Sequence, residues 1–208
     1  MFASLSDIRH AAIAAEGEGR FVAAIILLEQ CLRSDPLDGF GWLVLSDAYK
    51  ATGDYRACRR ALDHALEYAP GAEQWIVQNR LAMLASQLGL FEEAEHWFAA
   101  ANEAEEAKRH RWLLILRGAN LIDLERFTEA EKVLREAIAL EDGDDELDEA
   151  HHSLGIALLR QGEFDAARQS LERAAKICPE STQTGIALKS LEGVAEAIRL
   201  AGQLQCRQ

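Results

Sequence analysis

The stretch from Trp42 to Pro70 carries two helical hydrophobic patterns on either side of a short polar turn, Thr52-Gly53-Asp54. In both patterns apolar residues recur every three or four positions, with polar residues between them. A period near 3.6 residues is that of an α-helix with one buried face. Because proline cannot continue a helix interior, Pro70 closes the second pattern. The stretch therefore predicts two short helices joined as a hairpin.

The same hairpin pattern recurs along most of the chain. An aromatic residue opens each second helix, at separations of 34, 36, 36 and 37 residues, and these residues are Phe21, Tyr55, Phe91, Phe127 and Phe164. Three columns follow at fixed spacing: a small residue, a large apolar one and another small one. The first small column holds Ala24, Cys58, Ala94, Ala130 and Ala167; the large column holds Leu28, Leu62, Phe98, Leu134 and Leu171; the second small column holds Cys31, Ala65, Ala101, Ala137 and Ala174. Since small side chains let helices approach closely and a large one fills the gap, the columns predict the helix contacts.

The unit W-x2-L-S-x2-Y-x3-G-x-Y, followed by A-x3-L-x2-A-x4-P, resembles a tetratricopeptide repeat, a helix-turn-helix unit of about 34 residues. Ser46 stands where the family usually has glycine, and Cys58 where it usually has alanine. A glycine column at the turns, Gly19, Gly53, Gly89 and Gly162, predicts left-handed residues at those positions.

The resemblance covers roughly residues 5–181 and implies an all-α fold, a right-handed superhelical solenoid of helix-turn-helix pairs. The repeats are expected at residues 5–38, 39–72, 75–108, 111–144 and 148–181, with a capping helix at about 184–201. Because each unit buries its apolar face only on its neighbours, we expect residues 1–208 to form a single solenoid. No Gly or Pro interrupts the chain between Ala99 and Arg111, which predicts a longer second helix in the third repeat.

Composition narrows the classes of partner. The formal net charge of −13 argues against nucleic acid, because a duplex-binding surface needs an excess of Lys and Arg. No run approaches about 18 apolar residues, so we expect no membrane insertion, and the N-terminus shows no secretory signal. The four cysteines have no paired spacing and are interpreted as reduced thiols, which favours a cytoplasmic location.

No motif for catalysis, a cofactor or a metal appears, so we expect a non-enzymatic protein without cofactors. The acidic loop 141–146 misses the spacing of an EF-hand, and His151 and His152 lack a helical i, i+4 partner. The basic cluster of residues 108–111 has two interpretations. It is either a solvated helix end or a contact for phosphate or an acidic peptide.

The resemblance implies an interaction scaffold or adaptor, whose first helices line a concave groove for a peptide or an amphipathic helix of a partner protein. Transferred by register, the groove holds Arg9, Phe40, Leu43, Asp47, Asn79, Arg80, Met83, Trp112, Ile115, His152 and Ile156, with Ile13 and Ala119 in the same columns. For each residue the alternative is packing or plain solvent exposure. The family's clamp for chaperone tails is rejected, because its asparagines are missing.

The helix expected at residues 111–124 is apolar around its whole circumference. Such a helix is either buried on both sides or holds an apolar ligand. We expect Trp112 to be a central anchor for a segment bound across repeats two to four, with Arg80 and Asp47 setting its direction. Two alternatives stay open: a self-associating structural module that forms homo-oligomers, and an adaptor domain of a larger enzyme or of a secretion or chaperone system.

Overall fold

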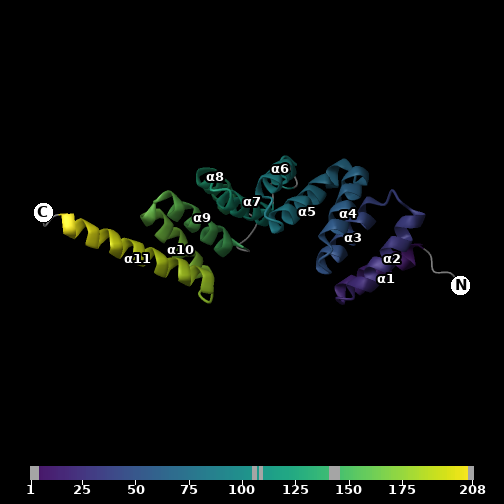
Figure 1. Ribbon diagram of the computed structural model, residues 1–208, viewed down its shortest axis with the longest axis horizontal. Helices are drawn as coiled ribbons and strands as arrows, with labels where there is room; N and C mark the ends of the chain where they lie inside the picture. The colour runs from purple at the N-terminus through teal and green to yellow at the C-terminus, as the bar shows by residue number, and fades with distance from the viewer. Residues whose placement is uncertain (1–4, 105–106, 108–109, 141–145, 206–208) are drawn as a thin grey trace. The chain divides into compact units, whose positions relative to one another are not determined.

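The computed structural model of the chain describes residues 5–104, 107, 110–140 and 146–205, and all regular secondary structure in these ranges is helical (Figure 1). The helices are α1 (Leu5–Gly17), α2 (Phe21–Ser34), α3 (Gly39–Ala51), α4 (Tyr55–Tyr68), the short 3₁₀ helix η1 (Gly71–Glu73), α5 (Gln74–Gln87), α6 (Phe91–Ala101), α7 (Arg111–Asp123), α8 (Phe127–Ala139), α9 (Leu147–Gln161), α10 (Phe164–Ile177) and α11 (Thr182–Gln205). The predicted all-α solenoid class is confirmed, with each expected repeat containing one helix pair.

The chain divides into two compact units, residues 1–104 and 105–208. The first unit holds the helix pairs α1–α2, α3–α4 and α5–α6, and the second holds α7–α8, α9–α10 and α11. Of the two extra residues before the third repeat, Glu73 ends η1 and Gln74 begins α5. A single right-handed solenoid through all five repeats stays a prediction.

The predicted packing columns are buried in every repeat. The large residues Leu28, Leu62, Phe98, Leu134 and Leu171 are each at most 1% exposed. Opposite them on the first helices lies the column of Ser46, where a Cβ on Gly118 would meet Leu134 at 2.6 Å and one on Gly155 would meet Leu171 at 2.6 Å. The large side chain of each second helix therefore fills the space that the small residue of the first helix leaves.

The turns confirm the glycine column, because Gly19, Gly53, Gly89 and Gly162 have φ between 73° and 83°. In the fourth repeat the same position is Glu125, which adopts φ 58° without the freedom of glycine. The carboxylates of Asp38 and Asp54 cap α3 and α4 by accepting from the backbone N–H groups of Gly41 and Ala57, both at 2.9 Å.

The expected long helix in the third repeat is wrong, because α6 ends at Ala101. The next amides tighten into a turn: Glu103 N–H donates to Ala100 O and Ala104 N–H donates to Ala101 O, both at 3.3 Å. Asn102 is a weak helix former, and the negative charge of Glu103 opposes the dipole at a helix C-terminus. The absence of Gly and Pro after Ala99 was therefore not enough to continue the helix.

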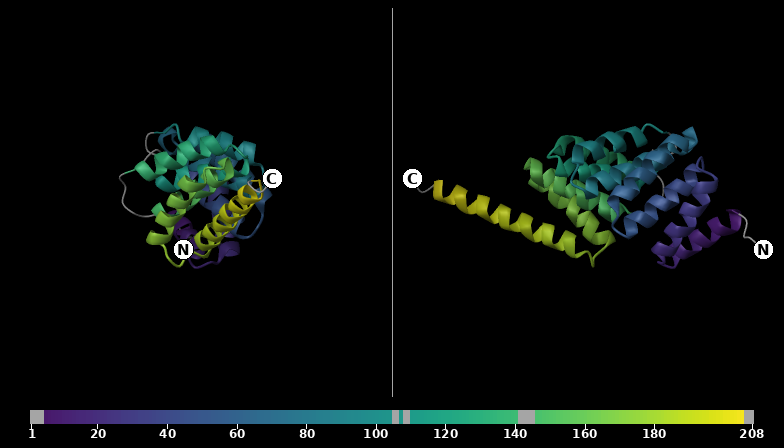
Figure 2. Two further views of the ribbon diagram at one scale, coloured as in Figure 1. Left: turned by 90° about the vertical axis from the view of Figure 1, so that its left-hand side faces the viewer. Right: turned by 45° about the vertical axis from the view of Figure 1, so that its right-hand side comes forward.

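The second unit has a continuous core that α11 joins. Leu191 of α11 is 1% exposed and belongs to the same core cluster as Leu114 of α7, Leu134 of α8 and Leu154 of α9. Figures 1 and 2 show α11 running past the end of the α9–α10 pair. The helix begins at Thr182 and extends to Gln205, a few residues beyond the predicted range.

Candidate functional site

The first helices of the first unit form a pocket of about 380 Å³ between α3 and α5. Three predicted groove residues, Phe40, Leu43 and Arg80, line it together with Ile76 and Val77. Phe40 is 52% exposed, which leaves an aromatic ring at the mouth of the pocket without the burial that a core residue would have. The sequence thus predicted three of the residues that line this pocket, which offers an apolar surface edged by the opposite charges of Arg80 and Glu73.

Asp47 and Arg80 pair with each other rather than standing free for a ligand. Arg80 Nη2 lies 3.1 Å from Asp47 Oδ2, joining α3 to α5. Burial raises the pKa of the Asp47 carboxyl above its usual value, and the Arg80 charge opposes part of that rise. Burial also raises the pKa of Glu16 on α1, and the nearby Asp47 charge adds to this. The first helices of the unit therefore share one charged cluster beside the apolar pocket.

Two further predicted residues lie on α5. Asn79 is 2% exposed, so its side chain is not a surface group. Its Nδ2 donates to the Met83 sulfur at 3.6 Å, and its Oδ1 has no hydrogen-bond partner among the described residues. Met83 is half-buried. Asn79 is therefore a packing residue and not a groove residue.

In the second unit the first helices and α11 form another pocket, of about 390 Å³. His152 and Ile156, both predicted, line it with three carboxylates, those of Asp123, Asp148 and Glu149. Burial lowers the pKa of His152, and the negative charges of Glu149 and Asp148 oppose this. Its Nδ1 lies 3.1 Å from the hydroxyl of Thr184 on α11. The pocket is acidic and polar, unlike the one in the first unit.

Some side chains of the apolar helix α7 lie in the core, and others lie at the surface. Ile115 is 2% exposed and belongs to the core of the second unit, so burial accounts for it. Trp112 is half-buried, with its ring centroid 6.3 Å from that of His110. Ala119 is exposed at the edge of the acidic pocket. Arg9 belongs to α1, but its side chain lies outside the described part of the chain.

The basic cluster is not the solvated helix end or ligand contact that the sequence suggested, at least at Arg111. This side chain is 2% exposed. Its Nε donates to Ala137 O at 3.0 Å and its Nη2 donates to Leu140 O at 2.7 Å, at the end of α8. A cation at a helix C-terminus satisfies carbonyls that have no partner within the helix. Lys108 and Arg109 lie outside the described residues, as does most of the acidic loop, residues 141–145.

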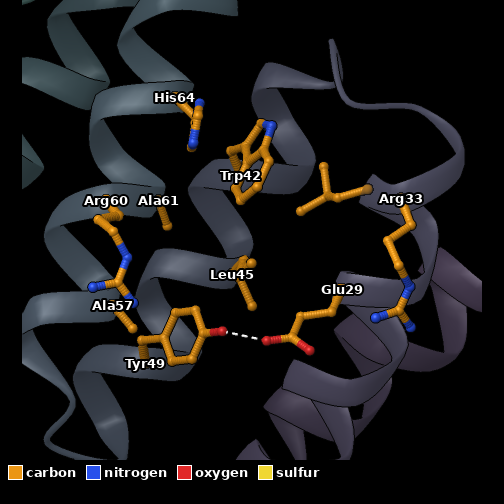
Figure 3. A pocket seen from close by; sticks show the side chains of 10 residues that line it. Glu29, Arg33, Trp42, Leu45, Tyr49, Ala57, Arg60, Ala61 and His64 are labelled. Atoms are coloured by element: carbon orange, nitrogen blue, oxygen red, sulfur yellow. Dashed lines mark hydrogen bonds between the residues drawn. The ribbon is translucent and has the colours of Figure 1, made fainter.

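Sequence reasoning missed pockets on the other side of the first helices, between successive second helices. In the first unit one of about 310 Å³ lies between α2 and α4, with α3 behind it (Figure 3). Trp42 stacks on His64 with ring centroids 4.4 Å apart, and its indole N–H donates to Pro36 O at 2.8 Å. The Tyr49 hydroxyl donates to Glu29 at 2.5 Å. Burial and this hydrogen bond raise the pKa of Tyr49 to about 12.

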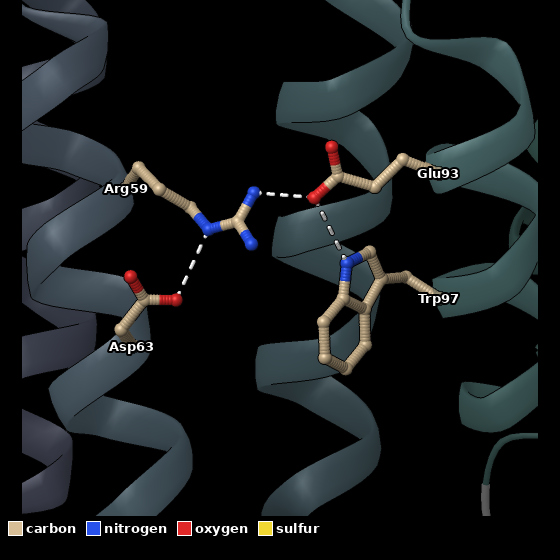
Figure 4. Close-up of polar contacts among 4 residues, drawn as sticks. All are labelled: Arg59, Asp63, Glu93 and Trp97. Carbon is tan, nitrogen blue, oxygen red and sulfur yellow. Dashed lines mark hydrogen bonds and ion pairs between the residues drawn. The ribbon is translucent and has the colours of Figure 1, made fainter.

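A polar cluster also joins second helices in this unit (Figure 4). Arg59 on α4 pairs with Asp63 of the same helix at 3.0 Å and with Glu93 of α6 at 2.5 Å. The hydrogen bond from Arg59 lowers the pKa of Glu93. The indole N–H of Trp97 points to the same Glu93 oxygen at 3.5 Å. The Arg59–Glu93 pair thus links the second helices of two neighbouring repeats, and because both side chains are partly exposed it adds little to stability.

The described residues offer neither a metal-binding cluster nor a membrane-spanning helix. No group of three His, Cys, Asp or Glu side chains there could hold a metal ion. None of the helices described is both long and apolar enough to cross a bilayer. Cys31 and Cys58 are buried free thiols and Cys178 is a half-buried one. The helix pairs and their pockets define an α-helical repeat protein.

Sequence models of the tetratricopeptide repeat match residues 15–81, 77–108 and 109–180. The chain belongs to the tetratricopeptide repeat family, whose members act as protein–protein interaction modules. Comparison with curated protein sequences gave no significant match.

Solved structures of three tetratricopeptide repeat proteins share the fold. YrrB, described as having an unusual peptide-binding site, is 16% identical, with 88% of this chain and 90% of that chain covered and a TM-score of 0.73. MamA of Desulfovibrio magneticus RS-1 is 16% identical, with 88% and 99% covered and a TM-score of 0.76. TTC0263 of Thermus thermophilus is 20% identical, with 90% and 98% covered and a TM-score of 0.60.

Proposed function

We propose that the chain is a non-enzymatic adaptor whose first helices hold an amphipathic segment of a partner protein. The observation that carries the proposal is Phe40, a 52% exposed aromatic ring at a pocket of about 380 Å³. Leu43 and Ile76 give the pocket apolar walls. Large exposed aromatic groups beside an apolar pocket are typical anchors of protein interfaces.

The charges favour a segment with a basic side. The chain carries a net charge of −13, and the pocket beside His152 is lined by three carboxylates. An acidic surface attracts a basic partner and speeds its association. Trp112, half-buried on α7, is a further anchor in this proposal. YrrB shares the fold and is described as having a peptide-binding site, which supports a peptide ligand here.

A cytoplasmic location belongs to the same proposal. Cys31 and Cys58 are free and buried. Burial raises the pKa of the Cys58 thiol to about 11, which keeps it protonated and unreactive. Free thiols of this kind suit a reducing compartment.

The test begins by capturing a partner from the native cell extract and mapping the bound segment to a synthetic peptide. The dissociation constant of that peptide is then measured for the wild type, Phe40→Ala and Trp112→Ala. We expect each substitution to weaken binding by about thirtyfold, since loss of an aromatic anchor costs roughly 2 kcal/mol.

Leu88→Ala is the matched control, because Leu88 is 47% exposed but does not line the pocket. Equal affinity of all four proteins would place the site elsewhere. If Trp112→Ala unfolds the chain, Trp112 is a core residue and Phe40 alone carries the test. If the captured partner is a second copy of this chain, the self-associating module replaces the adaptor.

A further inference from the structure

Helix α2 carries an exposed apolar stripe that the second helices of the other repeats lack. Val22 is 66% exposed and Ile26 is 59% exposed, and their spacing of four residues places them on one face of the helix. The other repeats have polar residues at both positions: Arg56, Glu92, Thr128 and Asp165 in place of Val22, and Arg60, His96, Lys132 and Gln169 in place of Ile26. The repeat fold therefore does not require apolar side chains at this surface.

Charged residues flank the apolar stripe on both sides. In the turn before α2, Glu18 and Arg20 pair at 2.6 Å, with side chains 61% and 62% exposed. After Ile26, Glu29 and Arg33 follow at spacings of three and four residues, which keeps them on the same face of α2. The order along this face is therefore acidic, basic, apolar, apolar, acidic, basic.

This order is complementary to itself when a second copy of α2 lies antiparallel to the first. Each charged residue then faces an opposite charge and each apolar residue faces an apolar one: Glu18 faces Arg33, Arg20 faces Glu29, and Val22 faces Ile26. A twofold axis repeats each of these contacts, as in any isologous interface. A parallel pair of helices would instead place identical charges opposite each other, which is unfavourable.

The charged groups of this face have capacity for a partner. Arg33 is exposed and has no ion pair with the described residues. Glu29 accepts the Tyr49 hydroxyl with Oε1, which leaves its Oε2 for a cation. Because Glu18 and Arg20 are mostly exposed, their pair can extend to further charges at little cost in desolvation.

We propose that this face joins two copies of the chain through antiparallel α2 helices. The occupant is a second copy, because the order of charges and apolar groups matches its own reverse, which a partner of another sequence would not require. No residue of α2 lines the pocket of Phe40, so the proposed peptide site on the first helices stays open in the dimer.

The test is sedimentation of the full chain from about 10 µM to about 1 mM, in about 0.15 M salt to screen the net charge. We expect a reversible monomer–dimer equilibrium with a dissociation constant of roughly 100 µM, since one helix per copy buries less than a standard interface. A chain that stays monomeric up to about 1 mM overturns the proposal.

Ile26→Arg introduces the residue that the second repeat has at this position, Arg60, so the fold should tolerate it. It should weaken the dimer by about tenfold or more, because a charge replaces an apolar contact on both copies. Ile186→Arg on α11 is the matched control: Ile186 is 60% exposed and lies outside α2, so the dissociation constant should not change. An unaffected dimer with Ile26→Arg, or an equal loss with both variants, contradicts the assignment to α2.

Exchanging the charges tests the antiparallel arrangement. Arg33→Glu should weaken the dimer by roughly fivefold, because it faces Glu18 of the other copy, and adding Glu18→Arg should recover most of this loss. A double variant no tighter than Arg33→Glu overturns the arrangement. A different protein that binds this face while the chain stays monomeric also overturns it. The mapped groove peptide should bind the Ile26→Arg chain with wild-type affinity, so failure of the groove and failure of this contact are distinguishable.

Discussion

At the residue scale, the close packing of the two helices of a repeat depends on glycines in the first helix. Gly118 and Gly155 lie where a Cβ would meet the leucine of the same repeat at 2.6 Å. Ser46 occupies the same column at 1% exposure, and its hydroxyl donates to Leu43 O at 2.6 Å. The family's usual glycine at this column therefore has a packing cause, and the serine is accommodated because its hydroxyl finds a backbone partner.

Gly118→Ala tests this contact directly. The added methyl must displace the buried Leu134, so we expect a loss of about 1–3 kcal/mol in the free energy of unfolding. The measurement is the urea midpoint at unchanged slope.

Gly185→Ala on α11 is the control, because no atom lies within 4 Å of the position that its added methyl would take. At position 185 the better helix propensity of alanine should raise the free energy of unfolding by about 0.5–1 kcal/mol. Equal effects of the two substitutions would mean that helix propensity, and not the close contact, decides the outcome.

At the element scale, periodicity predicted the helices well because each repeat buries a complete set of columns. It failed where single side chains decide an end. Helix α6 stops at Ala101 through turn hydrogen bonds that no period reveals. Arg111 looked like a surface charge in sequence, yet it is buried against the last carbonyls of α8. Its role depends on a contact 26 residues away, between Arg111 and Ala137.

Arg111→Met keeps the apolar stem of the side chain and removes its donors. Ala137 O and Leu140 O would lose these charge-assisted hydrogen bonds, so we expect about 1–3 kcal/mol of destabilisation. Urea denaturation of the full chain measures it, with Arg160→Met on the exposed face of α9 as the matched control. An unchanged midpoint for Arg111→Met would show that water replaces the guanidinium at no cost.

The candidate site was predictable in part. Register transfer found Phe40, Leu43 and Arg80, because first-helix columns repeat with the fold. It also selected Ile115, which is core, because a column says which way a residue points and not how closely its neighbours cover it. The pocket between α2 and α4 could not be found from the sequence, because its walls come from three helices of two successive repeats.

At the scale of the whole molecule, the two units carry different surfaces on their first helices. The first unit offers the apolar pocket at Phe40, and the second offers the acidic pocket at His152. The first surface suits an apolar partner group, and the second suits a basic one. The net charge of −13 makes the association of a basic partner dependent on salt.

The central claim is that the first helices bind the partner segment, and hydrogen exchange tests it most directly. Backbone exchange is compared for the full chain alone and with the mapped partner peptide at saturation. We predict slower exchange in α3 and α5, which line the pocket of Phe40, and unchanged exchange in α2 and α4. Slower exchange confined to α2 and α4, with α3 and α5 unchanged, would contradict the account.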